Sequence, residues 1–300
     1  MSAHWKRRKL LALRSKNTKQ KLDLSEDYKS KICENAYLGK KGYTIPKSSI
    51  DEKDLNELYS ELKVQPMTSG VAYNTSVDEG SFPVYRENAN KIYIPRFYGI
   101  QRYGLPHRSE ITKGENINVN FPKPLRDYQN KIVDVYMNHV KNPICAHSEN
   151  KGNGGILEVP CGRGKTVMAL KIISLVQKKT LIIVHKEFLM NQWIERANEF
   201  LPDVRIGKIQ GPVFDVENKD IVIGMLQTLY DRAFPENAFE SFGLTIIDEV
   251  HRIGSEQFSK SLLRILTPNM LGISATVDRK DKLTCVSVSY THLRAHETRS

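Results

Sequence analysis

The segment 160–166 reads Pro-Cys-Gly-Arg-Gly-Lys-Thr and separates a strand-like run from a helix-like run. Apolar residues dominate 154–159 before it, and 165–177 after it carry apolar residues at helical spacing. A helix N-terminus has unpaired N–H groups and a partial positive charge, so it attracts anions. We therefore predict a phosphate-binding loop made of Pro160, Cys161, Gly162, Arg163, Gly164, Lys165 and Thr166.

Each residue type in this loop has a physical reason to be there. Gly162 and Gly164 let the backbone curl around a phosphate without a Cβ clash. Lys165 would reach the terminal phosphates of a nucleotide, and the Thr166 hydroxyl would bind Mg²⁺. The strict form of the pattern has glycine where this chain has Val159. The alternative is a glycine-rich turn before an ordinary helix.

A second candidate site lies about eighty residues further along the chain. Residues 244–248 read as a buried strand that ends at Asp248, with Glu249 and His251 directly after it. Asp248 could hold Mg²⁺ opposite the Thr166 hydroxyl, and Glu249 could act as general base on the attacking water. We place His251 where it could sense the γ-phosphate. The alternative is an exposed acidic strand end.

Bulk composition excludes several classes of protein. The 300 residues allow one or two domains, and no run of eighteen apolar residues is present, so we expect no membrane span. The beginning of the chain lacks the apolar core of a signal peptide. The four cysteines have neither metal-ligand nor disulfide-framework spacing. These features predict an intracellular protein of the cytoplasm or nucleus.

The net charge of +11, with a pI of about 9.3, suits a polyanionic partner such as nucleic acid. The excess is concentrated in residues 1–22, before the first acidic residue at Asp23. We interpret this segment as a basic, disordered arm that either touches nucleic acid or serves as a nuclear address. A solvated tail is the equal alternative.

The pattern changes character along the chain. Residues 23–118 predict a smaller α+β accessory region, with a helix at 51–62 and strands at 82–85 and 91–98. Its interleaved aromatic and basic residues could stack bases, but we favour the interpretation that most of them form a core. From 119 onward strands and helices alternate, which predicts a parallel sheet with helices on both faces and a ligand at the carboxyl strand ends. The expected strands cover 180–185, 204–209, 220–225, 244–248 and 271–274, and the expected helices 165–177, 186–201 and 257–266.

With these residues placed, the chain resembles the superfamily 2 helicases. Within them it is similar to the branch that holds the TFIIH translocase subunit and the transcript-release helicases of large DNA viruses. The resemblance covers 119–284 and follows the order of the family motifs. These are the adenine motif at 125–129, motif I at 160–166, Ia at 184–193, Ib at 209–211, Ic at 225–229, II (Asp-Glu-Val-His, the DEVH box) at 248–251, and III at 274–276 with an extension at 278–281.

The resemblance implies a fold, cofactors and roles for particular residues. The fold would be a RecA-like P-loop domain that binds ATP and Mg²⁺, with Lys165, Asp248 and Glu249 as its catalytic residues. The expected partner is nucleic acid, with DNA favoured, together with transcription or repair machinery; a viral protein of this kind would work in the viral factory. By the same resemblance, Arg126 and Gln129 would bind adenine, His185, Lys186, Gly211, Gln227 and Thr228 would contact nucleic acid, and Ser274 and Thr276 would couple hydrolysis to movement.

The resemblance also implies a second RecA-like domain with arginine fingers soon after Thr284. Residues 285–300 do not continue the family pattern, so we exclude them from the expected fold as a non-native-looking tail. We accordingly expect these 300 residues to hydrolyse ATP only weakly, as the N-terminal part of an ATP-dependent DNA helicase or translocase. Two alternatives stay open: the motor subunit of a restriction or repair nuclease, and a nucleic-acid-binding module with ATP only as a ligand.

Overall fold

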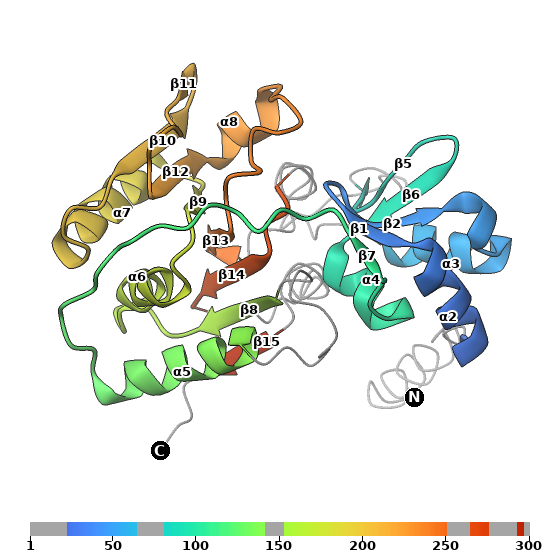
Figure 1. The fold of residues 1–300 in the computed structure, drawn as a ribbon, viewed down its shortest axis with the longest axis horizontal. Helices are drawn as coiled ribbons and strands as arrows, with labels where there is room; N and C mark the ends of the chain where they lie inside the picture. Colours follow the sequence, from blue (N-terminus) through green and yellow to red (C-terminus); the bar gives the residue numbers. More distant parts are fainter. Residues whose placement is uncertain (1–22, 65–80, 142–152, 251–264, 276–292, 297–300) are drawn as a thin grey trace, which may run out of the picture.

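The computed structural model describes residues 23–64, 81–141, 153–250, 265–275 and 293–296. Figure 1 shows two units side by side. The accessory region (23–118) is drawn in blue to cyan and the α/β domain (119 onward) in green to red. Among the described residues, no helix is long and apolar enough to cross a membrane.

The accessory region is an α+β unit, as the sequence predicts. Its five-stranded sheet has the order β5-β6-β2-β1-β7, and a separate two-stranded sheet pairs β3 with β4. Tyr43, Leu58 and Ile92 are fully buried in its own hydrophobic core. The elements are α2 (Glu26–Asn35), β1 (Tyr37–Gly39), β2 (Gly42–Pro46), the 3-10 turn η1 (Lys47–Ser49), α3 (Glu52–Glu61), β3 (Lys63–Val64), β4 (Phe82–Pro83), β5 (Arg86–Glu87), β6 (Lys91–Ile94), α4 (Arg96–Tyr103) and β7 (Arg108–Ser109).

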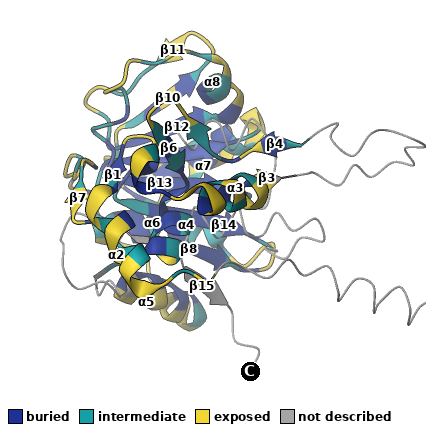
Figure 2. Cartoon of the chain, turned by 90° about the vertical axis from the view of Figure 1, so that its right-hand side faces the viewer, coloured by how far each residue is buried: buried dark blue, intermediate teal, exposed yellow. Residues whose placement is uncertain are grey.

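The α/β domain is built on an eight-stranded sheet with the order β11-β10-β12-β9-β13-β14-β8-β15. Every pair in this sheet is parallel except β10 with β11, which confirms the predicted parallel sheet. The central strands lie deep inside the molecule, as the dark blue of β13 and β14 in Figure 2 shows. The strands are β8 (Asn153–Glu158), β9 (Thr180–Val184), β10 (Ile206–Gln210), β11 (Val213–Phe214), β12 (Ile221–Met225), β13 (Leu244–Asp248), β14 (Asn269–Ser274) and β15 (Leu293–His296).

Apolar residues cover both faces of this sheet. Successive side chains of a strand point to opposite faces, so Ile182 belongs to one hydrophobic cluster and Leu181 to the other. Residues of three helices fill the first cluster, and residues of α8 and the accessory region contribute to the second. The helices are α5 (Asp127–Lys141), α6 (Lys165–Val176), α7 (Glu187–Phe200) and α8 (Leu226–Asp231).

A buried arginine of the accessory region joins the two units. Arg96, at the start of α4, is only 2% exposed. Its guanidinium donates hydrogen bonds to the backbone carbonyls of Thr267, at 2.8 Å, and Pro268, at 3.4 Å. Burial lowers the pKa of Arg96 to about 9, which still leaves the side chain charged at neutral pH. Because Thr267 and Pro268 directly precede β14, this contact holds the accessory region against the base of a central strand.

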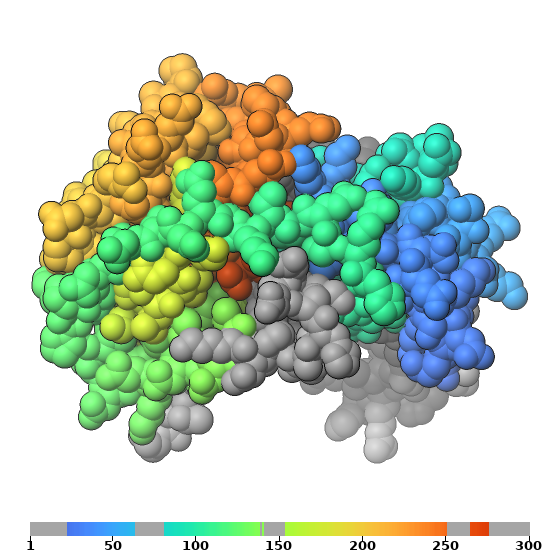
Figure 3. Space-filling view, in the orientation of Figure 1, coloured from blue at the N-terminus to red at the C-terminus, as the bar shows by residue number. Residues whose placement is uncertain are grey.

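The segment that connects the units runs along the α/β domain before α5 begins. Figures 1 and 3 show it in green, crossing from the accessory side to the other side of the molecule. The Thr112 hydroxyl donates to the Glu240 carbonyl, and the Ile117 N–H donates to the Gln177 carbonyl. The chain therefore contacts the α/β domain several residues before 119.

The predicted strand at 91–98 is wrong in its second half. β6 ends at Ile94, and Pro95 is the N-cap of helix α4. Proline has a fixed φ that suits the start of a helix, and it cannot donate in a sheet, so the ladder stops there. The preferred interpretation of the aromatic residues is supported, since Phe97 and Tyr103 are buried and the Tyr98 hydroxyl bonds to Glu61.

Three other predictions concern the excluded tail, the basic arm and the helix expected at 257–266. Residues 293–296, which belong to the tail that we excluded from the fold, form β15 and pair with β8. Without β15, strand β8 would lie at the sheet edge with unpaired N–H and C=O groups. The basic arm lies outside the described residues. So does most of the expected helix at 257–266, whose last two residues, Ile265 and Leu266, are not helical.

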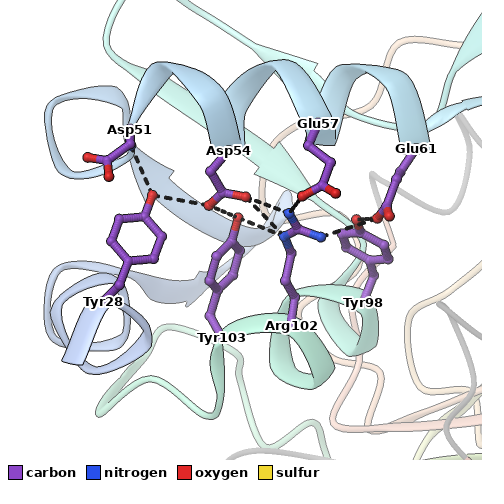
Figure 4. A network of polar contacts seen from close by, with 8 residues as sticks. All are labelled: Tyr28, Asp51, Asp54, Glu57, Glu61, Tyr98, Arg102 and Tyr103. Carbon is purple, nitrogen blue, oxygen red and sulfur yellow. Dashed lines mark hydrogen bonds and ion pairs between the residues drawn. The ribbon is translucent and has the colours of Figure 1, made fainter. Parts of the chain in front are cut away.

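The accessory region holds a buried charge network between α3 and α4 (Figure 4). Asp54 is fully buried and accepts from the Arg102 guanidinium at 2.6 Å and from the Tyr103 hydroxyl at 2.7 Å. Arg102 also pairs with Glu57 and Glu61. Burial alone would lower the pKa of Arg102, but the bond to Asp54 and its other acidic partners raise it well above its usual range.

Replacement of Arg102 by methionine should destabilise the accessory region by about 3–5 kcal/mol, because it leaves the Asp54 carboxylate buried without its counter-ion. The change is measured as the free energy of unfolding in urea. Arg108→Met is the matched control: the pair Arg108–Glu110 is exposed, so its loss should cost less than about 1 kcal/mol. Equal losses in the two variants would contradict the conclusion that Arg102 is the buried counter-ion of Asp54.

Candidate active site

The predicted phosphate loop connects β8 to α6 at the carboxyl end of the sheet. Its two glycines have positive φ, 78° at Gly162 and 81° at Gly164, which favours glycine over other residues. Gly164 is the N-cap of α6, and it has no side chain that could occupy the first N–H groups of the helix. The Lys165 ammonium donates to the Val159 carbonyl at 3.1 Å. The Lys165 ammonium is therefore held by the backbone of the residue that directly precedes the loop.

Two residues at the start of α5 brace this loop. The Gln129 side chain, which is 6% exposed, donates to the Arg163 carbonyl at 3.1 Å and accepts from the Arg126 N–H at 3.0 Å. The Tyr128 hydroxyl donates to the same Arg163 carbonyl at 3.0 Å. The adenine motif thus lies against motif I, while the contacts of Arg126 and Gln129 with adenine stay a prediction.

Asp248 ends β13 and is 9% exposed. Its Oδ2 accepts from the Trp193 indole N–H at 2.9 Å, and its Oδ1 accepts from the Glu249 N–H at 2.9 Å. Burial raises the pKa of Asp248; the Trp193 hydrogen bond opposes this rise, and so does the charge of Lys165. Lys165 follows the loop after β8, and Asp248 ends β13 at the same edge of the sheet, so motifs I and II lie on one edge.

Glu249 has a backbone conformation that few residues adopt. Its φ is +53°, in the left-handed region, although it is not a glycine. Such strain costs about 1–3 kcal/mol and concentrates at functional sites. It marks the point at which the chain leaves β13, next to the Asp248 carboxylate.

The parallel register explains why motifs I, II and III meet. β13, β14 and β8 are neighbours, with Asp248 paired to Ile273 and Ser274 paired to Glu158. The Val159 N–H also donates to the Ser274 carbonyl at 3.0 Å. Ser274 is buried at this edge, whereas His251 and Thr276 lie outside the described residues.

These residues fit a nucleotide with Mg²⁺. A Cβ built on Gly162 meets no atom within 4 Å, so there is open space on that side of the loop. Mg²⁺ in nucleotide sites is typically bound by one or two protein oxygens together with phosphate and water. The Asp248 carboxylate and the Thr166 hydroxyl are oxygen ligands of this kind. Cys161 is exposed in the loop.

The other predicted motifs gather at the adjacent half of the same edge. Motifs Ia, Ib and Ic follow β9, β10 and β12, which are also neighbours. The Thr228 hydroxyl accepts from the Gly211 N–H at 2.9 Å and so joins Ic to Ib. The Gln210 amide donates to the Glu187 carboxylate at 3.1 Å and so joins Ib to α7, directly after His185 and Lys186. Lys186, Gly211 and Gln227 are exposed, and the Gln227 amide bonds to Asp231.

Two residues at these sites carry contacts that the sequence did not reveal. Trp193 reads as one apolar residue of an amphipathic helix, yet its N–H binds Asp248. Arg232 donates to the Gly211 and Pro212 carbonyls, at 3.4 and 3.0 Å, and thereby supports motif Ib. The usable signal for Trp193 was its polar N–H, because a buried indole N–H usually finds a partner.

Comparison with known proteins shows which proteins this chain resembles. The model of a family described as "Type III restriction enzyme, res subunit" matches residues 122–279. "Putative ATP-dependent RNA helicase L396" of Acanthamoeba polyphaga mimivirus is 32% identical over 242 residues, which are 80% of this chain and 45% of the relative. "DNA 3'-5' translocase XPB2" of Sulfurisphaera tokodaii is 33% identical over 195 residues, which are 62% and 39% of the two chains. The chain thus spans less than half the length of these relatives.

A solved structure shows the same fold. The UvsW helicase of bacteriophage T4 superposes with a TM-score of 0.51 over 81% of this chain and 93% of that chain, at 17% sequence identity. The predicted RecA-like architecture is therefore confirmed at the level of the fold.

Gly164→Ala should destabilise the protein more than Gly162→Ala, as measured by the midpoint of thermal unfolding without nucleotide. Both substitutions place alanine at positive φ, at a cost of about 1–2 kcal/mol. At Gly164 the new Cβ would also lie 2.4 Å from the Gln129 amide nitrogen and displace the brace, whereas at Gly162 the space is open. An equal or smaller effect at Gly164 would show that Gln129 does not brace the loop.

Proposed function

Because the chain belongs to the family described as "Type III restriction enzyme, res subunit", we propose that it contains the ATP-binding motor domain of an ATP-dependent DNA helicase or translocase. One observation carries this proposal: motifs I, II and III follow three adjacent strands, β8, β13 and β14, and motifs Ia, Ib and Ic follow the next three, β9, β10 and β12, at the same sheet edge. A nucleotide site and a nucleic-acid face on one rigid edge are what a motor of this type requires.

The residues at the nucleotide half divide the chemistry among them. Lys165 neutralises charge on the β- and γ-phosphates, and Thr166 and Asp248 hold Mg²⁺. When bound, this ion supplies compensation for the charge that develops on the phosphate oxygens. Glu249 accepts the proton of the attacking water.

Gln129 has hydrogen-bonding groups left for a base while it braces the loop. A side-chain amide has two N–H donors and two acceptor lone pairs. The bonds to Arg163 and Arg126 use one of each, so one donor and one acceptor remain for the edge of adenine. The same amide would therefore contact both the bound base and the phosphate loop.

The nucleic-acid half supports binding through the phosphate backbone. The Thr228 hydroxyl accepts from the Gly211 N–H and keeps its own O–H as a donor. Such a hydroxyl can contact phosphate without reading base sequence. The net charge of +11 favours a polyanion. We favour DNA because one relative is named a DNA translocase, and RNA, which the name of the mimivirus relative indicates, is the alternative.

The motor subunit of a restriction or repair nuclease remains the second candidate, because the description of the matched family names such an enzyme. Both candidates use the same motor domain. The names of the two relatives, a helicase and a translocase, favour the first. A module that only binds ATP would not require Glu249.

Lys165→Ala should weaken binding of ATP with Mg²⁺ by roughly ten- to hundredfold, because a charged hydrogen-bond partner of the phosphates contributes about 1.5–3 kcal/mol. Isothermal titration calorimetry measures the affinity. Lys171→Ala, which removes the same charge further along α6, is the control and should bind normally. Glu249→Gln should keep the affinity and lower any measurable hydrolysis about 10²–10⁴-fold. Undiminished affinity in the Lys165 variant would refute the proposed phosphate site.

Thr228→Val should weaken nucleic-acid binding about two- to tenfold, because it removes a hydroxyl that can donate to a phosphate and that joins motif Ic to motif Ib. A hydrogen bond of this kind contributes a net value of about 0.5–1.5 kcal/mol. Fluorescence anisotropy with labelled DNA and RNA strands of several sequences provides the measurement. The affinity of the unmodified chain should fall with salt and hardly depend on base sequence. Thr112→Val, in the connecting segment, is the control. Preference for RNA strands would favour the RNA alternative, and unchanged binding by Thr228→Val would remove Ic from the nucleic-acid face.

A further inference from the structure

The indole of Trp193 reaches the carboxylate to which we assign Mg²⁺. Trp193 lies on α7 and is 1% exposed, and its Nε1–H donates to Oδ2 of Asp248 at 2.9 Å. We propose that Trp193 is a positioning residue that fixes the Asp248 carboxylate in its magnesium-binding orientation. This inference rests on the proposed function, since it assumes that Asp248 holds the metal.

The two described hydrogen bonds of Asp248 determine how its carboxylate is turned. Oδ1 accepts from the Glu249 N–H at 2.9 Å, and Oδ2 accepts from Trp193. One donor on each oxygen removes the rotation of the carboxylate plane. Each carboxylate oxygen has about two lone-pair sites, so each keeps one for an ion or its water. The arrangement therefore orients Asp248 and leaves it able to bind a cation.

Trp193 is suited to this task because its ring cannot move independently. It belongs to the hydrophobic cluster that covers one face of the sheet, together with Met190 and Ala197 of the same helix. Among the hydrogen bonds of the described residues, it provides the single side-chain donor to Asp248. A donor fixed by packing holds its acceptor more firmly than a flexible or solvent-exposed group could.

Loss of this donor would have a specific consequence. Oδ2 is part of a carboxylate that is only 9% exposed, so water cannot easily replace the indole N–H. The carboxylate would then turn toward other donors and present a different edge to the metal. Residues that orient metal ligands in this way typically contribute 10–100-fold to metal affinity. The contribution should appear only when Mg²⁺ is present.

The test isolates the N–H group. In a Trp5→Phe background, which leaves Trp193 as the single tryptophan, position 193 is replaced by phenylalanine and, separately, by 3-benzothienylalanine. The second residue keeps the bicyclic shape and has sulfur in place of N–H. Calorimetry with a non-hydrolysable ATP analogue is run with Mg²⁺ and with EDTA. We expect unchanged affinity in EDTA and a gain from Mg²⁺ that is smaller by roughly tenfold in both variants.

Met190→Ala is the matched control, since it removes buried volume from the same helix and leaves both hydrogen bonds of Asp248 in place. Its gain from Mg²⁺ should equal that of the background protein. The emission of Trp193 should shift when nucleotide and Mg²⁺ bind together, and should not shift with nucleotide in EDTA. A full gain from Mg²⁺ in the benzothienylalanine variant would overturn the inference alone. A background protein that gains no affinity from Mg²⁺ would overturn the proposed function, and this inference with it.

Discussion

Parallel pairing of β13, β14 and β8 is the constraint on which the rest of the site depends. Parallel strands end at one edge, so Asp248, Ser274 and the phosphate loop meet there although they lie far apart in the sequence. The bond from the Val159 N–H to the Ser274 carbonyl extends this alignment beyond the last paired residues. A shift in register would move Asp248 away from the phosphate loop that follows β8.

Helix α7 links the two halves of this edge. Its first residue, Glu187, contacts Gln210 on the nucleic-acid half, and Trp193 contacts Asp248 on the nucleotide half. Because the helix is anchored in the hydrophobic core, both contacts belong to one rigid body. In the proposed motor, α7 therefore connects a displacement of the nucleic-acid face directly to the carboxylate that binds the metal.

The described residues of the accessory region contribute hydrophobic packing to the α/β domain. Phe82, Val84 and Phe97 complete one of the two hydrophobic clusters of the large sheet. Arg96 supports the segment before β14 through two backbone carbonyls. The internal ion network around Asp54 keeps α3 and α4 together, so the face that they present to the α/β domain is well defined (Figure 4).

The sequence by itself determined the elements and the chemistry of the site. Apolar periodicity located six strands of the α/β domain within one or two residues, because buried parallel strands need continuous apolar runs, but it missed the short strands β11 and β15. The residue types of the phosphate loop and of Asp248–Glu249 predicted a nucleotide site, because glycine, lysine and carboxylate at those spacings have few other uses. Pro95 also carried its own signal, which the interpretation of 91–98 as one strand ignored.

Only the tertiary structure decided which donors meet which acceptors. Trp193 and Asp248 are 55 positions apart, and Arg96 and Thr267 are 171 apart. Periodicity assigns such residues to a buried face but cannot tell which partner lies opposite, because the partner is chosen by strand order and by the packing of helices on the sheet. Sequence thus specified the reacting groups, whereas the fold specified how Asp248 is turned and what holds it there.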